Sequence, residues 1–243
     1  MMKTRKYFFH FLIAPLLFLP GQAMAQERGT LTLTFMNTVK GRPVIKGNAV
    51  YRNSLGEDFS ITKLKYYVSQ PVIRGKNEFR DEGYYLVDEG KRNSISLSVP
   101  TGFFEGISFL FGIDSLRHCS GAQEGDLDPV MDMFWTWNSG YVIFKLEGNS
   151  PSSGADLERI EHHIGGYKGN NNVSKEINLS FPIPVSVAPG ENKEVFIEMD
   201  LDKYWNSSVP LYISKDPVIT KPGGDAVRVS ANFKNMFSFH SIR

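Results

Sequence analysis

The sequence has one cysteine among its 243 residues, Cys119, so it cannot form a disulfide bond within one chain. Stability must come from apolar burial, which a chain of this length can achieve without covalent cross-links. No run of roughly 18 apolar residues follows position 25, so we expect no transmembrane helix. Basic residues form no stripe along the chain, and the sequence therefore gives no indication of a nucleic-acid partner.

The first 25 residues have the layout of a cleavable secretory signal. Three basic residues precede a largely apolar stretch, 7–19, and an Ala-Met-Ala sequence ends at Ala25. We expect residues 1–25 to be a signal peptide and residues 26–243 to be one domain, located in the periplasm or secreted. Removing three basic residues and no acidic ones would change the formal net charge from +1 to −2.

Alternation of apolar and polar residues recurs along the rest of the chain. The clearest runs are residues 29–35, 94–99, 195–201 and 227–231. Turn-rich sequences bound them, which is typical of strands. The pattern predicts an all-β fold, as a single β-sandwich or barrel-like domain. Two polar stretches, 148–155 and 167–174, are expected to be long surface loops, which are often functional.

Two of the three tryptophans lie in the segment MFWTWNSGY, residues 133–141. Side chains at positions i and i+2 of a strand point the same way, so Trp135 and Trp137 would form one aromatic surface. Such a surface can fill a core or, if exposed, stack on a sugar ring. An indole near a metal site can also be oxidised, and its product can become a ligand.

Histidine and cysteine could provide metal ligands in this region. Neutral imidazole binds copper and zinc, and soft sulfur ligands favour Cu(I), so His118, His163 and Cys119 are candidates. The chain has no His-Glu-x-x-His or Cys-x-x-Cys zinc signature. Histidines are also common as partly buried hydrogen-bonding residues, and a free cysteine is commonly a small buried hydrophobe.

Other chemistries have weaker support in the sequence. An aspartate cluster could hold calcium, although it lacks the EF-hand pattern and turn formation explains it equally well. Its members are Asp114, Asp126, Asp128 and Asp132. Glu147 and Glu161 could form an acid/base pair, but their spacing says nothing about their separation. With no Gly-x-Ser-x-Gly motif either, we expect no enzymatic activity.

Several segments resemble, in order, the MbnP-like copper-binding family of exported bacterial proteins. They are LKYYVSQ, YYLVD, FGIDSLRHCSGAQEGDLDP, MFWTWNSGYVIFKLEG, HHIGGYKG and ANFKNMFSF. The resemblance implies a β-rich periplasmic or secreted protein associated with copper. It also implies binding through histidines and, in some relatives, conversion of a tryptophan to kynurenine by a partner diheme enzyme of the MauG and cytochrome c peroxidase type.

Carried over residue by residue, the resemblance implies His163, in His-Ile-Gly-Gly, as the first metal ligand and His118 as the second. Trp135 is the first candidate for modification and Trp137 the second. Asp132 stands where relatives often carry glycine.

Two further residues are weaker ligand candidates. His162 is expected to face solvent, because it would point to the opposite face of a strand from His163. Cys119 could add a Cu(I) ligand or simply pack. The sequence thus predicts an exported accessory protein that binds Cu(I) through histidines near a tryptophan pair. The alternative is a non-catalytic β-sandwich module that binds carbohydrate or a protein partner through an aromatic surface.

Overall fold

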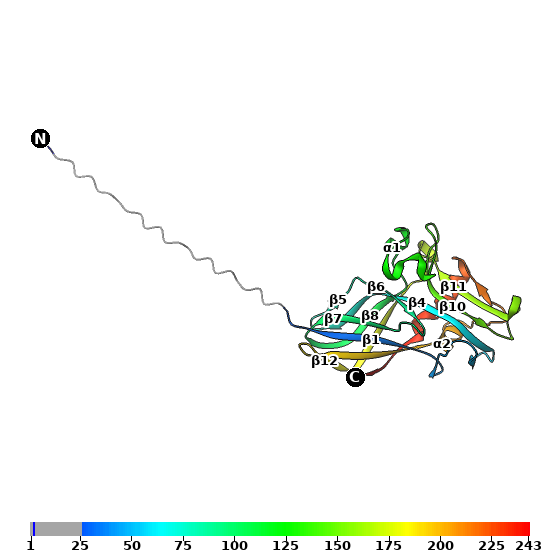
Figure 1. Ribbon diagram of the computed structural model, residues 1–243, viewed down its shortest axis with the longest axis horizontal. Helices are drawn as coiled ribbons and strands as arrows, with labels where there is room; N and C mark the ends of the chain where they lie inside the picture. Colours follow the sequence, from blue (N-terminus) through cyan, green and yellow to red (C-terminus); the bar gives the residue numbers. More distant parts are fainter. Residues whose placement is uncertain (1, 3–25) are drawn as a thin grey trace.

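The computed structural model describes residue 2 and residues 26–243, and the latter form two β-sheets packed face to face (Figure 1). The expected signal peptide, apart from Met2, lies outside the described residues. The smaller sheet has the order β15-β13-β1-β2, with β7 also paired to β1, and β1 and β13 run parallel. Its strands are β1 (Arg28–Val39), β2 (Arg42–Pro43), β7 (Ser94–Pro100), β13 (Asn192–Asp200) and β15 (Phe237–Ile242).

The larger sheet has the order β12-β8-β4-β10-β11-β14, and four short strands attach to β4 or β10. Its long central strand, β4, pairs with both β8 and β10. The strands are β3 (Val50–Arg52), β4 (Asp58–Gly75), β5 (Phe79–Arg80), β6 (Tyr84–Asp88), β8 (Gly102–Phe111), β9 (Phe134–Thr136), β10 (Gly140–Asn149), β11 (Arg159–Gly165), β12 (Lys175–Val187) and β14 (Val218–Ile219).

Apolar side chains from the facing surfaces of the two sheets form the main core. Leu31, Leu33 and Phe35 of β1 are fully buried, as the alternation predicts. The Phe35 ring makes edge contacts with Tyr66 of β4 at 6.1 Å and Phe109 of β8 at 5.8 Å, measured between ring centroids. The all-β prediction is confirmed, in its sandwich form.

The helices are short. They are α1 (Ser115–Cys119), α2 (Leu201–Trp205) and α3 (Gly224–Ser230), with 3-10 turns η1 (Gly125–Leu127), η2 (Pro129–Met131), η3 (Asp156–Glu158), η4 (Gly169–Asn171) and η5 (Phe233–Met236). No helix in the described part of the chain is long and apolar enough to cross a membrane. The strand expected at 227–231 is wrong: α3 buries Ala226 and Val229, which have the i, i+3 spacing of a helix face.

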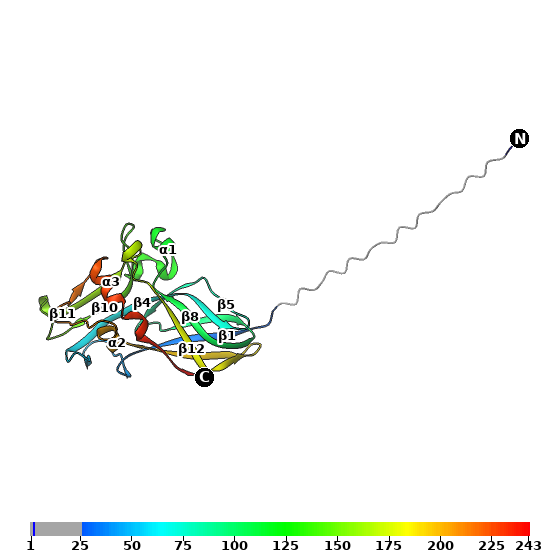
Figure 2. The same cartoon turned by 180° about the vertical axis from the view of Figure 1, so that it is seen from behind.

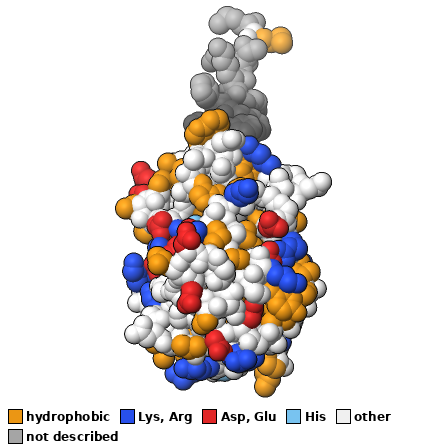
Figure 3. Space-filling view, turned by 90° about the vertical axis from the view of Figure 1, so that its right-hand side faces the viewer, with side chains coloured by type: hydrophobic (Ala, Val, Ile, Leu, Met, Phe, Trp, Pro, Cys, Tyr) orange, Lys and Arg blue, Asp and Glu red, His pale blue; other side chains and the backbone are white. Residues whose placement is uncertain are grey.

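The α1 segment projects on one side of the sandwich, away from the smaller sheet, and both views show this (Figures 1 and 2). Acidic and basic side chains are interspersed on the end of the molecule shown in Figure 3. The α1 segment lies beside the hairpin of β9 and β10, which carries the paired tryptophans.

Candidate functional site

The hairpin separates the two tryptophans instead of presenting them together. Strand β9 pairs with the start of β10 and ends at Thr136, so Trp137 lies in the turn that follows. Trp137 is 77% exposed, whereas Trp135 is half-buried. The single aromatic surface inferred from i, i+2 spacing assumed a strand through both residues. That assumption fails because β9 is only three residues long.

Trp135 packs on the end of β11. A Cβ atom placed on Gly165 would lie 2.7 Å from Cζ3 of Trp135, so the absence of a side chain at Gly165 allows the indole to sit there. Gly165 and His163 are two residues apart on β11 and therefore share a face of the sheet. The structure thus brings the first-choice tryptophan and the first-choice histidine to the same face.

His163 is held by a carboxylate. Its Nε2 lies 2.9 Å from Oε1 of Glu147 on β10, and Oε1 of Glu161 is at 3.9 Å. Burial raises the pKa of Glu147, but hydrogen bonds from His163 and Lys63 outweigh it and lower the pKa below its ordinary value. Because a carboxylate only accepts, Nε2 carries the proton and the Nδ1 lone pair stays available. Metal-ligating histidines commonly have this arrangement.

Lys63 links Glu147 to Asp132, which lies in the chain just before the tryptophan strand. Lys63 Nζ lies 3.2 Å from Glu147 and 3.0 Å from Asp132, and Lys145 Nζ lies 3.0 Å from the same Asp132 carboxylate. Lys145 is 3% exposed and also donates to the Asp132 carbonyl. We call Lys63, Asp132, Lys145, Glu147 and His163 the charged face. It connects the turn before β9 directly to His163.

Asp132 has a left-handed backbone, with φ at 62°. Glycine adopts this conformation at least cost, so the aspartate here has a backbone cost that glycine would not have. Burial raises the pKa of Asp132, while hydrogen bonds from Lys145 and Lys63 lower it, so the carboxylate is ionised. The ion pairs with these two lysines offset the backbone cost in this chain.

His118 is fully buried at α1 and lies away from the charged face. Its ring stacks on Tyr167 with centroids 4.8 Å apart, and its Nδ1 accepts a hydrogen bond from the backbone N–H of Tyr141 at 3.1 Å. The proton of the neutral ring is therefore on Nε2, which is buried and lacks a partner among the described residues. Burial lowers the pKa of His118 to about 4.

This arrangement does not favour His118 as a metal ligand. One ring nitrogen accepts a hydrogen bond and the other carries the proton, so neither offers a lone pair. The structure attaches His118 to the first residues of β10, whereas His163 stands opposite Lys145 further along that strand. The two-histidine ligand set stays a prediction, and it would require α1 to move.

The expectation that His162 faces solvent is wrong. His162 and His163 do point to opposite faces, but His162 is the buried member of the pair. Its Nε2 donates to the Asp216 carbonyl at 2.7 Å, and its Nδ1 accepts from the Tyr204 hydroxyl at 2.7 Å. Burial lowers the pKa of His162 to about 4. The alternation of side chains along β11 placed the two histidines on opposite faces, but it did not show that α2 covers the face of His162.

Cys119 ends α1 and is exposed, contrary to the expectation of a partly buried hydrophobe. The aspartates of the calcium hypothesis all have protein partners. Asp114 and Asp128 cap the short helices α1 and η2, Asp126 pairs with Arg92, and Asp132 belongs to the charged face. Within the described residues, no three His, Cys, Asp or Glu side chains are grouped to hold a metal ion.

Sequence reasoning missed the two lysines of the charged face. Lys145 and Glu147 interrupt the largely apolar strand β10 at alternate positions, and Lys63 and Lys65 do the same on β4. Charged residues at alternate positions of a mostly apolar strand indicate that these side chains share the face turned away from the apolar core. The sequence therefore contained a signal for this face, but it did not show that Glu147 would pair with His163.

A comparison with families of known proteins matches residues 28–221 to the family MbnP. Among solved structures, MbnP from Methylosinus trichosporium has a similar fold, with a TM-score of 0.61 and 15% sequence identity. The match covers 89% of this chain and 98% of that chain. No curated protein matches the sequence.

Proposed function

This chain belongs to the MbnP family, and on that premise we propose that it is an exported, non-catalytic copper-binding protein with its Cu(I) ligand at His163. Family membership fits a copper-associated accessory protein. The observation that carries the proposal is the Glu147–His163 hydrogen bond, which leaves Nδ1 open on the face that Trp135 covers. Imidazole is a suitable copper ligand when its second nitrogen donates to a carboxylate.

We further propose that Trp135 is the tryptophan that a partner diheme enzyme of the MauG type oxidises to kynurenine. Trp135 packs against Gly165, two residues from His163 on the same face of β11, so its oxidised product would add polar atoms near the proposed metal ligand. Trp137 lies in the exposed turn and makes the second candidate. Its exposure also supports the alternative function, a stacking surface for carbohydrate or a protein partner.

In a Cu(I) competition titration against a chromogenic chelator under reducing conditions, His163→Ala is expected to abolish binding. Glu147→Gln is expected to weaken binding about 10- to 100-fold, because a neutral amide oxygen holds the Nε2–H of His163 less strongly than the carboxylate does. Glu161→Gln should change little, since Glu161 lies 3.9 Å from the same nitrogen.

The control for these variants is His240→Ala, which removes an exposed histidine on β15 of the other sheet. Unchanged affinity in His163→Ala would contradict the proposal. Loss of binding in a folded His118→Ala variant would establish the two-histidine site and show that α1 rearranges around copper.

Co-expression with the diheme partner is expected to change the mass of the peptide that contains Trp135. The same peptide should be unmodified in protein made without the partner, because oxidation requires the second enzyme. The change should persist in Trp137→Phe and vanish in Trp135→Phe, as read by peptide mass spectrometry. The reverse pattern would assign the modification to Trp137.

A further inference from the structure

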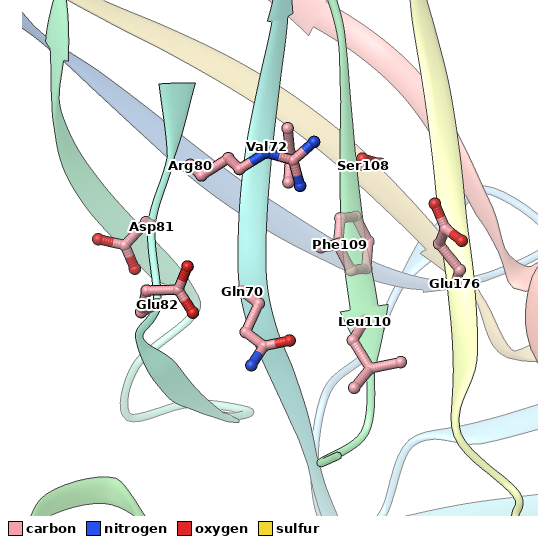
Figure 4. A pocket seen from close by; sticks show the side chains of 9 residues that line it. All are labelled: Gln70, Val72, Arg80, Asp81, Glu82, Ser108, Phe109, Leu110 and Glu176. Atoms are coloured by element: carbon pink, nitrogen blue, oxygen red, sulfur yellow. The ribbon is translucent and has the colours of Figure 1, made fainter. Parts of the chain in front are cut away.

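A hollow of about 340 Å³ lies on the larger sheet, where β4, β5, β8 and β12 run side by side (Figure 4). Val72 of β4 and Leu110 of β8 supply its apolar surface. Polar side chains approach from both sides: Arg80 and Glu82 from β5 and the chain after it, and Glu176 from β12 (Figure 4). None of these residues belongs to the charged face.

Two observations distinguish this hollow from an ordinary surface depression. Ser108 is only 7% exposed, and its hydroxyl has no hydrogen-bond partner in the described part of the chain, so it opens to the hollow alone. Gln70 has a left-handed backbone, with φ at 50°, where the pairing of β4 with β8 shifts register. Such irregularities re-aim side chains and are common next to binding sites.

The polar groups lie at different ends of the hollow. Arg80 extends toward Ser108 (Figure 4). One of its guanidinium nitrogens pairs with Glu78 at 2.5 Å, and its other N–H groups, together with the Ser108 hydroxyl, can donate to a ligand carboxylate. The Nε2 of Gln70 is occupied by the Tyr84 hydroxyl at 2.9 Å, which leaves its amide oxygen as an acceptor. Glu82 and Glu176 provide negative charge on opposite sides.

We propose that this hollow binds an α-amino acid with a cationic side chain. The ligand carboxylate pairs with Arg80 and Ser108. Its two ammonium groups are placed near Glu82 and Glu176, and its methylene chain packs on Val72. Three carboxylates and one guanidinium line the hollow, and this excess of negative charge favours a ligand with a second ammonium group. The volume is in the range of small-ligand sites.

Isothermal titration of the full mature chain with L-lysine tests this proposal. L-Norleucine lacks the side-chain ammonium and 1,5-diaminopentane lacks the carboxylate, so each is expected to bind at least tenfold more weakly than L-lysine. Ser108→Ala and Glu176→Gln are each expected to weaken lysine binding about tenfold, the effect of one lost charge-assisted hydrogen bond. Glu124→Gln, an exposed glutamate elsewhere, is the matched control and should bind as wild type does.

Absence of lysine binding at millimolar concentration would overturn the proposal. So would equal affinity for 1,5-diaminopentane, because the carboxylate contact with Arg80 would then contribute nothing. Equal lysine affinity in wild type and in both variants would place the ligand elsewhere on the protein. The Cu(I) titrations address His163 and its partners, none of which lines the hollow, so failure of either proposal leaves the other unaffected.

Discussion

Acidification from pH 7 to pH 4 is expected to lower the free energy of unfolding by on the order of 6 kcal/mol, through His118 and His162 alone. Both are fully buried, and burial lowers each pKa to about 4 from an ordinary 6.5. Each ring stays neutral in the fold but is protonated in the unfolded chain below pH 6.5. Stability is therefore lost as the pH falls from about 6.5 to about 4.

Denaturant unfolding measured at half-unit steps from pH 7.5 to pH 4 checks this expectation. His162→Gln should roughly halve the slope of unfolding free energy against pH, because one of the two titrating groups is removed. His240→Gln, the same substitution at an exposed position, is the matched control. A pH-independent unfolding free energy between pH 7 and pH 5 would contradict the buried, neutral state of both rings.

The ionised carboxylates respond in a lower pH range. The pKa values of Asp132 and Glu147 lie below their ordinary values, so their stabilising contribution is complete above about pH 4.5 and is lost only at lower pH. Stability lost above pH 5 is therefore assigned to histidine. The two effects can be separated in one titration.

Gly165→Ala is expected to lower the free energy of unfolding by about 2–3 kcal/mol, as overpacking does, and to displace Trp135. The added methyl would contact the Trp135 ring and the backbone carbonyl of Tyr141 at once. A backbone atom within a strand pair cannot move independently, so the indole has to give way. We expect Trp135 fluorescence to shift to longer wavelength and Cu(I) affinity to fall with it.

Gly154→Ala is the matched control, because a Cβ atom there meets nothing within 4 Å and the backbone is not left-handed. It should leave stability, fluorescence and Cu(I) binding as in wild type. A Gly165→Ala protein with unchanged stability and unchanged fluorescence would show that Trp135 does not rest on the end of β11.

The strands in which apolar and polar residues alternate are the part of the fold that the sequence predicts. Leu31, Leu33 and Phe35 face the core as expected, since alternation over seven residues leaves little choice of register. The run at 227–231 was too short to separate a strand from one face of a helix. Trp137 illustrates the same limit of local patterns. Strand β9 ends at Thr136, one residue before Trp137, so the Trp137 side chain lies in a turn.

The sequence by itself determined the all-β class and the family, and it predicted Trp135 and His163 as the first candidates for the site. Local periodicity and motif order contain that information. Only the tertiary structure decided which histidine retains an open nitrogen. That depends on Glu147, Tyr141 and Tyr204, whose contacts with the histidines span 16 to 42 residues of sequence. A ring nitrogen acquires its role from whichever donor or acceptor the fold places against it, and no local pattern specifies that partner.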